Sequence, residues 1–295
     1  MRDFLDEVNK RIVMLDGAMG TELDRRGIPT GHCHELWNVE EPEQVHEIHR
    51  AYLQAGADAV LTNTFGGSRL KLAAYGLADR AYELNLRATE IARVEAGDDH
   101  FVLGDIGPTG LFMEPLGTTS QSEFHDAFAE QINAFVAGGA DAVIVQTMSA
   151  IEEAVAAVGA ARETCSLPVL GLVGFKRDAD GDAFHTVMGV DIERAVNELS
   201  EAGADVIGTN CWNSLGEICE IVRRMKRLTH KPLAAEPNAG QPRLVEGKTV
   251  FDESPEQMAD GVEELVGAGA RIIGGCCGTT PEHIRLMALR VRQLE

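Results

Sequence analysis

The chain has 295 residues, 44% of them hydrophobic and 25% charged, which suits one large core and excludes a disordered protein. Its 26 lysines and arginines against 47 aspartates and glutamates give a net charge of −21, which repels nucleic-acid phosphates and anionic lipid surfaces. No apolar run reaches the roughly 20 residues of a membrane helix, and residues 1–7 lack the order of a signal peptide, so we expect a cytoplasmic protein with no nucleic-acid or membrane partner.

Short apolar runs alternate along the chain with amphipathic stretches, which indicates parallel strands connected by helices. Two of the helices have clear start signals, because Ser254 and Thr280 each precede a proline in the first helical turn. We expect eight strands, at residues 12–15, 59–61, 101–103, 143–145, 169–173 and 233–235 and directly after residues 205 and 271.

A four-residue phrase of small residues recurs where helical patterns end, at residues 55–58, 138–141, 202–205 and 268–271. Its glycine suits the left-handed residue that closes a helix. The spacings between these glycines are 83, 64 and 66 residues, room for two strand–helix units of about 30 residues each. Eight such units predict an α/β fold, a single-domain (β/α)8 TIM barrel over residues 1–295, with an open doubly wound sheet as the alternative.

Three of the six cysteines follow predicted strands, Cys211 after the sixth and Cys276 and Cys277 after the eighth. Strand ends meet at the C-terminal rim of a barrel, where active sites lie. Three thiolates with one open position are typical of a reactive zinc site, whereas a structural site takes four protein ligands. The remaining cysteines follow no predicted strand, and we expect Cys33, Cys165 and Cys219 to be buried apolar thiols.

A thiol that binds to zinc loses its proton and becomes a nucleophile, so the trio predicts alkyl transfer to a small thiol. A non-catalytic zinc site or thiol switch at Cys276 and Cys277 is the alternative from another class. Two weaker candidates are also expected to lie in solvated loops: the stretch His32–His34 as a metal site, and Lys176, beside residues 177–182, as a Schiff-base lysine.

Several motifs at the strand ends together resemble the zinc-dependent homocysteine S-methyltransferase family, from about residue 10 to the C-terminus. They most resemble the homocysteine-binding barrel of cobalamin-dependent methionine synthase. The double cysteine in its glycine frame is the most specific of them. The motifs are DGAMGT at 16–21, TNTFG at 62–66, GDIGPTG at 104–110, NC at 210–211, EPNAG at 236–240 and GGCCGTTP at 274–281.

The resemblance implies a (β/α)8 barrel that methylates L-homocysteine to methionine, with Cys211, Cys276 and Cys277 as zinc ligands and catalytic residues. It implies that the Asp16–Met19 loop holds the amino-acid end of the acceptor and that Asn238 approaches the metal when no thiol is bound. The implied substrate-binding residues are Asp16, Gly17, Ala18, Met19, Asn63, Thr64, Gln146, Asn210, Glu236 and Asn238.

One position departs from the family pattern, because Gln146 stands where the family usually has a glutamate that helps to hold the homocysteine ammonium. A neutral amide forfeits the charge-assisted part of that contact, so either Asp16 or Glu236 compensates or the acceptor is a different thiol. The methyl donor must come from outside this chain, as a methylated corrinoid on a separate protein, S-methylmethionine, a betaine or a folate-linked donor. A corrinoid-linked methyltransferase for another acceptor is the alternative within this class.

Overall fold

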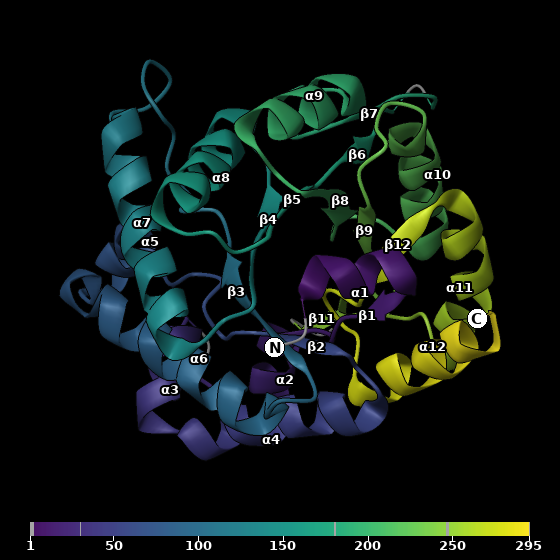
Figure 1. The fold of residues 1–295 in the computed structure, drawn as a ribbon, viewed down its shortest axis with the longest axis horizontal. Coiled ribbons are helices and arrows are strands. Elements are labelled where there is room, and N and C mark those ends of the chain that lie inside the picture. The colour runs from purple at the N-terminus through teal and green to yellow at the C-terminus, as the bar shows by residue number, and fades with distance from the viewer. Residues whose placement is uncertain (1–2, 30, 180, 246–247, 295) are drawn as a thin grey trace.

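The computed structural model describes residues 3–29, 31–179, 181–245 and 248–294. The predicted domain boundaries at residues 1 and 295 lie outside these residues and stay a prediction. Eight parallel strands form one sheet in the order β1-β12-β9-β8-β5-β4-β3-β2 (Figure 1). The strands are β1 (Val13–Met14), β2 (Ala59–Leu61), β3 (Phe101–Ile106), β4 (Ala142–Met148), β5 (Val169–Val173), β8 (Val206–Asn210), β9 (Leu233–Glu236) and β12 (Ala270–Ile273).

The sheet curls into a barrel, because β1 and β2 at its two ends come together where the Asp58 amide donates to the Met14 carbonyl at 2.7 Å. A ring of helices surrounds it (Figure 1). The predicted (β/α)8 barrel is therefore confirmed, and the open-sheet alternative is excluded. The surrounding helices are α4 (Pro42–Ala55), α6 (Ala81–Ala96), α7 (Gln121–Gly138), α8 (Ile151–Thr164), α9 (Ile192–Ala202), α10 (Leu215–Lys226), α11 (Pro255–Ala268) and α12 (Pro281–Leu294).

Two apolar layers make up the core. Inside the barrel, alternate strand residues such as Leu103, Ile144 and Leu172 pack with Phe4 and Val8 of helix α1 (Phe4–Lys10). Outside the barrel, the other strand residues pack against the buried faces of the helices. The short segments α2 (Met19–Arg25), η1 (His34–Leu36), α3 (Trp37–Glu40), α5 (Arg69–Leu72), η2 (Ala73–Tyr75) and η3 (Ala78–Arg80) lie in the first two strand-to-helix connections.

The repeated four-residue phrase closes helices as predicted. Its glycine caps the preceding helix in the left-handed conformation at each of the four places, with φ of 102° at Gly56, 86° at Gly139, 101° at Gly203 and 114° at Gly269.

The aspartate that ends three of the four phrases binds the base of the preceding strand. In each case its carboxylate accepts a backbone N–H at 2.8 Å and also pairs with an arginine. The phrase is thus a structural device at the N-terminal end of the barrel, away from the rim. The aspartate, amide and arginine are Asp58, Met14 and Arg11; Asp141, Val102 and Arg93; and Asp205, Val169 and Arg162.

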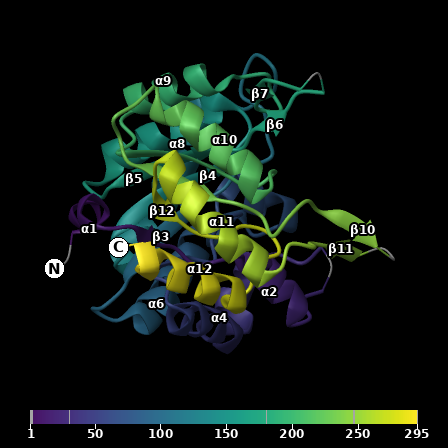
Figure 2. The same ribbon diagram turned by 90° about the vertical axis from the view of Figure 1, so that its right-hand side faces the viewer.

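Two hairpins extend the rim: β6 (Lys176–Arg177) with β7 (Phe184–His185), and β10 (Arg243–Val245) with β11 (Lys248–Val250). Figure 2 shows both at the end of the barrel opposite α1. Arg177 is exposed, as the expected solvated loop at 177–182 requires, but it lies in strand β6 and not in a loop. Its guanidinium packs over the Phe184 ring with its Cζ 4.5 Å from the centroid. Asp180 lies outside the described residues. Within the described ranges, no helix has the length and apolar character needed to span a bilayer.

Candidate active site

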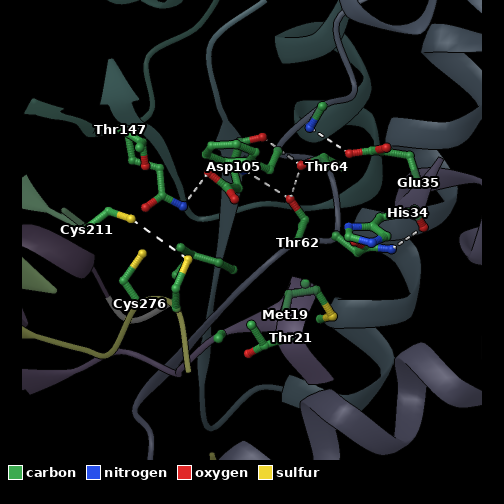
Figure 3. A pocket seen from close by; sticks show the side chains of 18 of the residues that line it. Met19, Thr21, His34, Glu35, Thr62, Thr64, Asp105, Thr147, Cys211 and Cys276 are labelled. Carbon is green, nitrogen blue, oxygen red and sulfur yellow. Dashed lines mark hydrogen bonds between the residues drawn. The ribbon is translucent and has the colours of Figure 1, made fainter. Parts of the chain in front are cut away.

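Three cysteines from two strand ends meet at the C-terminal rim. Cys211 follows β8, and Cys276 and Cys277 follow β12. Their sulfur atoms all lie within 4.8 Å of one another, and the Sγ atoms of Cys211 and Cys277 are 3.8 Å apart (Figure 3). Zinc–sulfur bonds of about 2.3 Å in a tetrahedron place sulfur atoms about 3.8 Å apart, so the trio fits one shared zinc ion.

Backbone contacts fix the loops that carry the sulfurs. The Cys211 amide donates to the Glu236 carbonyl at 3.0 Å, and the Cys276 amide donates to the Pro237 carbonyl at 2.8 Å. Gly278 adopts φ +84°, and a Cβ at this residue would lie 2.3 Å from the Phe251 ring. Only glycine fits there, which explains part of the glycine frame around the double cysteine.

The three thiols of the trio differ in their pKa values. Hydrogen bonds from the Cys276 and Cys277 thiols, followed by other donors, lower the pKa of Cys211 well below its ordinary value. The same interactions with Cys211 raise the pKa of Cys276 and Cys277. The cluster therefore favours one thiolate even without a cation. A divalent cation would make all three ionised sulfurs favourable, because it supplies the opposite charge.

A cavity of about 370 Å³ opens beside the sulfurs and holds most of the predicted substrate-binding residues. Gly17, Ala18, Met19, Asn63, Thr64, Gln146 and Glu236 line it together with all three cysteines. Three predicted residues do not line it. Asp16 is buried and accepts the Leu61 amide, Asn210 bonds to Gln146 behind the wall, and the buried Asn238 lowers the pKa of Cys211 through a hydrogen bond.

Buried carboxyl groups concentrate around this cavity. Asp16, Asp105 and Glu236 are almost fully buried, and burial raises the pKa of each, to about 8 for Asp105. The Oε1 atom of Glu236 has no hydrogen-bond partner among the described residues. Carboxyl groups in such surroundings need either protons or a cationic partner, so the cavity is built to accept a positively charged group.

Gln146 is held in one orientation by two partners. Its Nε2 donates to Asp105 Oδ1 at 2.8 Å, and its Oε1 accepts from Asn210 Nδ2 at 2.7 Å. Asn210 in turn bonds Thr147 through the Thr147 amide at 2.9 Å and the hydroxyl at 2.7 Å. A glutamate at residue 146 could not donate to Asp105 unless it were protonated, so the amide matches the carboxylate beside it.

Sequence reasoning did not give Asp105 a role, although its motif was noted. Asp105 lies within the otherwise apolar strand β3, and that burial of a carboxyl group was the available signal. The outer part of the cavity was also missed: Phe65 lies in the motif at 62–66 and His32 and His34 were considered only as metal ligands, while the other side chains come from connections with no motif of their own. The side chains of this outer part are His32, His34, Glu35, Phe65, Lys71 and Tyr75.

The expected solvated loop at His32–His34 is wrong for its middle residue. Cys33 is buried, and its thiol donates to the Glu35 carboxylate at 3.1 Å. Glu35 also accepts the Gly66 amide at 2.6 Å, which ties this segment to the wall of the cavity (Figure 3). Over the described residues, the trio at 211, 276 and 277 is the only group of three or more histidine, cysteine or acidic side chains close enough together to hold a metal ion.

The other cysteines and Lys176 lie apart from the trio. Cys33 and Cys219 are buried, as expected, whereas Cys165 is only half-buried, because it follows the end of α8. Lys176 packs over the Trp212 ring, with its Nζ 4.1 Å from the centroid, and does not line the cavity. A Schiff-base role for this lysine has no support.

Comparisons with known proteins agree with this geometry. A family model described as homocysteine S-methyltransferase matches residues 13–291. The methionine synthases of Mycobacterium tuberculosis (strain ATCC 25618 / H37Rv) and Mycobacterium leprae (strain TN) are each 34% identical to the chain, over 99% and 98% of it. These matches cover 26% and 25% of the relatives, so the chain spans about a quarter of their length.

Solved structures show the same fold. The metallated form of the homocysteine methyltransferase MmuM from Escherichia coli matches with a TM-score of 0.78 and 27% identity, over 96% of this chain and 98% of that one. A methyltransferase from Methanosarcina mazei matches with a TM-score of 0.59 over 98% of this chain and 97% of that one, but at 11% identity it supports the fold alone.

Proposed function

The chain belongs to the homocysteine S-methyltransferase family, and we propose that it transfers a methyl group to the sulfur of homocysteine, giving methionine, at a zinc ion held by Cys211, Cys276 and Cys277. The observation that carries this proposal is the meeting of three sulfurs within 4.8 Å at the wall of a cavity with buried carboxyl groups. Zinc bound there supplies the Lewis acidity that keeps an incoming thiol ionised at neutral pH.

The buried carboxyl groups select the acceptor. Homocysteine carries an ammonium group, and Asp105 and Glu236 give that group the charge that Gln146 lacks. Gln146 keeps the Asp105 carboxylate in place at 2.8 Å. The loop 16–19 and residues Asn63 and Thr64 form the wall beside it. These buried carboxyl groups support homocysteine, rather than a thiol that lacks an ammonium group, as the acceptor.

The reaction needs orientation more than proton transfer. The acceptor sulfur uses one electron pair to form its bond to the methyl carbon, while the bond between that carbon and the donor breaks and its electrons leave with the donor. The thiol proton has already gone to solvent, so no general base is required at the moment of transfer. The walls of the cavity contribute by holding the sulfur in line with the methyl group.

The methyl donor would approach the cavity from the C-terminal rim, where many of the exposed apolar side chains lie. Ten of the seventeen large hydrophobic side chains that are exposed in the described parts of the chain lie in the segments after β2, β3, β5 and β9. Two of them, Phe65 and Tyr75, line the cavity, and exposed apolar side chains gathered in such connections suit a protein-binding site. The ten are Phe65, Tyr75, Leu111, Phe112, Leu116, Val187, Met188, Leu244, Val245 and Val250.

The apolar side chains at the rim favour a methyl donor that is carried by a separate protein, and we propose a methylated corrinoid protein as that donor. The alternatives to be tested are a free folate-linked donor and a small-molecule donor. A cytoplasmic setting belongs to the same proposal, since a reducing compartment keeps the trio of thiols available for zinc.

The function is tested with zinc-loaded protein, a panel of thiols and a panel of donors, and the methylated product is measured by mass spectrometry. We expect methionine from homocysteine with at least one donor. If only a different thiol is methylated, that thiol and not homocysteine is the acceptor. Zinc binding with no methylated product from any pair would favour the zinc-storage or thiol-switch alternative.

Introducing charge at the rim is expected to weaken use of a protein-borne donor. Leu116→Asp and Leu244→Asp change side chains that are 75% and 78% exposed, so folding should be little affected. The KM for the methylated corrinoid protein should rise about tenfold, as for loss of an apolar anchor, while homocysteine binding stays unchanged. Val94→Asp on α6, 70% exposed, is the matched control away from the rim. Equal KM values for all three variants would argue for a small donor.

A further inference from the structure

The backbone at Cys211, the first ligand of the proposed zinc site, and at the residue after it has an unusual conformation. Cys211 and Trp212 both adopt φ +57°, and neither is glycine. Non-glycine residues rarely adopt this left-handed conformation, and two in succession persist only where the surroundings enforce it. The pair lies directly after β8, so its conformation decides where the Cys211 sulfur points.

Hydrogen bonds hold the ends of this short segment. The Cys211 amide donates to the Glu236 carbonyl at 3.0 Å, and the Asn213 amide donates to the Cys211 carbonyl at 2.6 Å. The Asn213 side chain donates to the Phe175 carbonyl at 2.7 Å. These contacts hold residues 211 and 213 in place. The residue between them, Trp212, is held by the packing of its own side chain.

The Trp212 ring is seated on the segment that follows the neighbouring strand β5. A Cβ at Gly174 would lie 2.4 Å from Trp212 Cδ1 and 2.6 Å from its Nε1, so only a glycine allows this approach. Lys176 lies over the ring, with its Nζ 4.1 Å from the centroid. The indole Nε1 is buried and has no hydrogen-bond partner among the described residues, so packing and not a polar contact holds the ring.

We propose that Trp212, seated on Gly174 and covered by Lys176, is a positioning residue that keeps Cys211 in its left-handed conformation and so aims its sulfur at Cys276 and Cys277. The inference rests on the proposed zinc site and adds three residues to it that touch neither the metal nor the acceptor. Gly174 acts only through the room that it leaves for the ring.

The test is a double-mutant cycle on metal binding. Gly174→Ala pushes the ring away, and Trp212→Asn removes the ring but tolerates a left-handed backbone. Affinity for Zn²⁺ and Co²⁺ is measured by competition with a chelator, and the visible absorption of the Co²⁺ form reports the ligand geometry. Each single variant should bind about 10–100-fold more weakly, as do variants that lose an outer partner of a metal ligand, with a shifted Co²⁺ band.

The coupling separates positioning from general damage. Adding Gly174→Ala to Trp212→Asn should cause almost no further loss, because the clash exists only with the ring. Gly216→Ala is the matched control, since a Cβ there meets nothing within 4 Å, and it should bind both ions like the wild type. Wild-type affinity and spectrum in Trp212→Asn, or additive losses in the double variant, would overturn the inference. If wild-type protein itself binds neither ion, the proposed zinc site fails instead.

Discussion

Replacing Cys211, Cys276 or Cys277 singly with alanine is expected to strip the protein of zinc and abolish methyl transfer while the barrel stays folded. Two sulfurs hold zinc far less tightly than three, so the loss should exceed the about 10–100-fold that follows removal of an outer partner alone. The three cysteines lie at the rim, where they contribute little to the core. Zinc content by elemental analysis, turnover and the unfolding midpoint are measured together.

The matched control for this series is Cys165→Ala, which removes a half-buried thiol outside the trio. It should keep full zinc content and turnover. A rim variant that is demonstrably free of zinc but still methylates homocysteine at the wild-type rate would refute the role proposed for the trio.

The second large effect is expected from Asp105→Asn, which keeps the shape of the side chain but removes its charge. Homocysteine should bind at least about 100-fold more weakly, because breaking a buried ion pair costs about 3–5 kcal/mol. The measurement is the Kd for homocysteine beside that for 4-mercaptobutyrate, which has the thiol and the carboxylate but no ammonium. Only the Kd for homocysteine should change. Equal losses for both ligands would mean that Asp105 shapes the site without binding the ammonium.

The pH dependence gives a further check on Asp105. Burial raises its pKa from the ordinary 3.8 to about 8, so below that pH a proton competes with the ammonium. The affinity ratio of homocysteine to 4-mercaptobutyrate should therefore increase as pH rises towards about 8, and this increase should be absent in Asp105→Asn. In the free protein, the stability that the protonated carboxyl group provides below about 4 is lost as pH rises through about 8.

The sequence predicted the framework of the fold because local physics specifies it. Short continuous apolar runs that alternate with helical patterns favour strands buried on both faces, and the glycines at 56, 139, 203 and 269 suit the left-handed residue that ends a helix. The convergence of Cys211 with the vicinal pair followed from the topology alone, since the strands before them end at one rim.

The functional residues that the sequence did not reveal depend on contacts with residues far along the chain, which no local pattern encodes. Asp105 acquires its role from Gln146, 41 residues further along the chain, and Glu35 from the Gly66 amide, 31 residues away. The hairpin at Lys176 looked like a loop because its strands are only two residues long, and the packing of Arg177 on Phe184 cannot be read from the sequence. Trp212 carried no signal at all, since a left-handed backbone is not readable from a tryptophan.

The three buried acids and the three sulfurs come from different sets of barrel strands. Counted around the barrel, Asp16 follows the first strand, and Asp105 and Glu236 lie in the third and seventh. Cys211 and the vicinal pair follow the sixth and eighth strands. Alternate strands of such a barrel contribute separate layers of side chains. Substitutions at Asp105 and Glu236 therefore alter the charge that the acceptor meets on strands that carry no proposed zinc ligand, which leaves the three sulfurs in place.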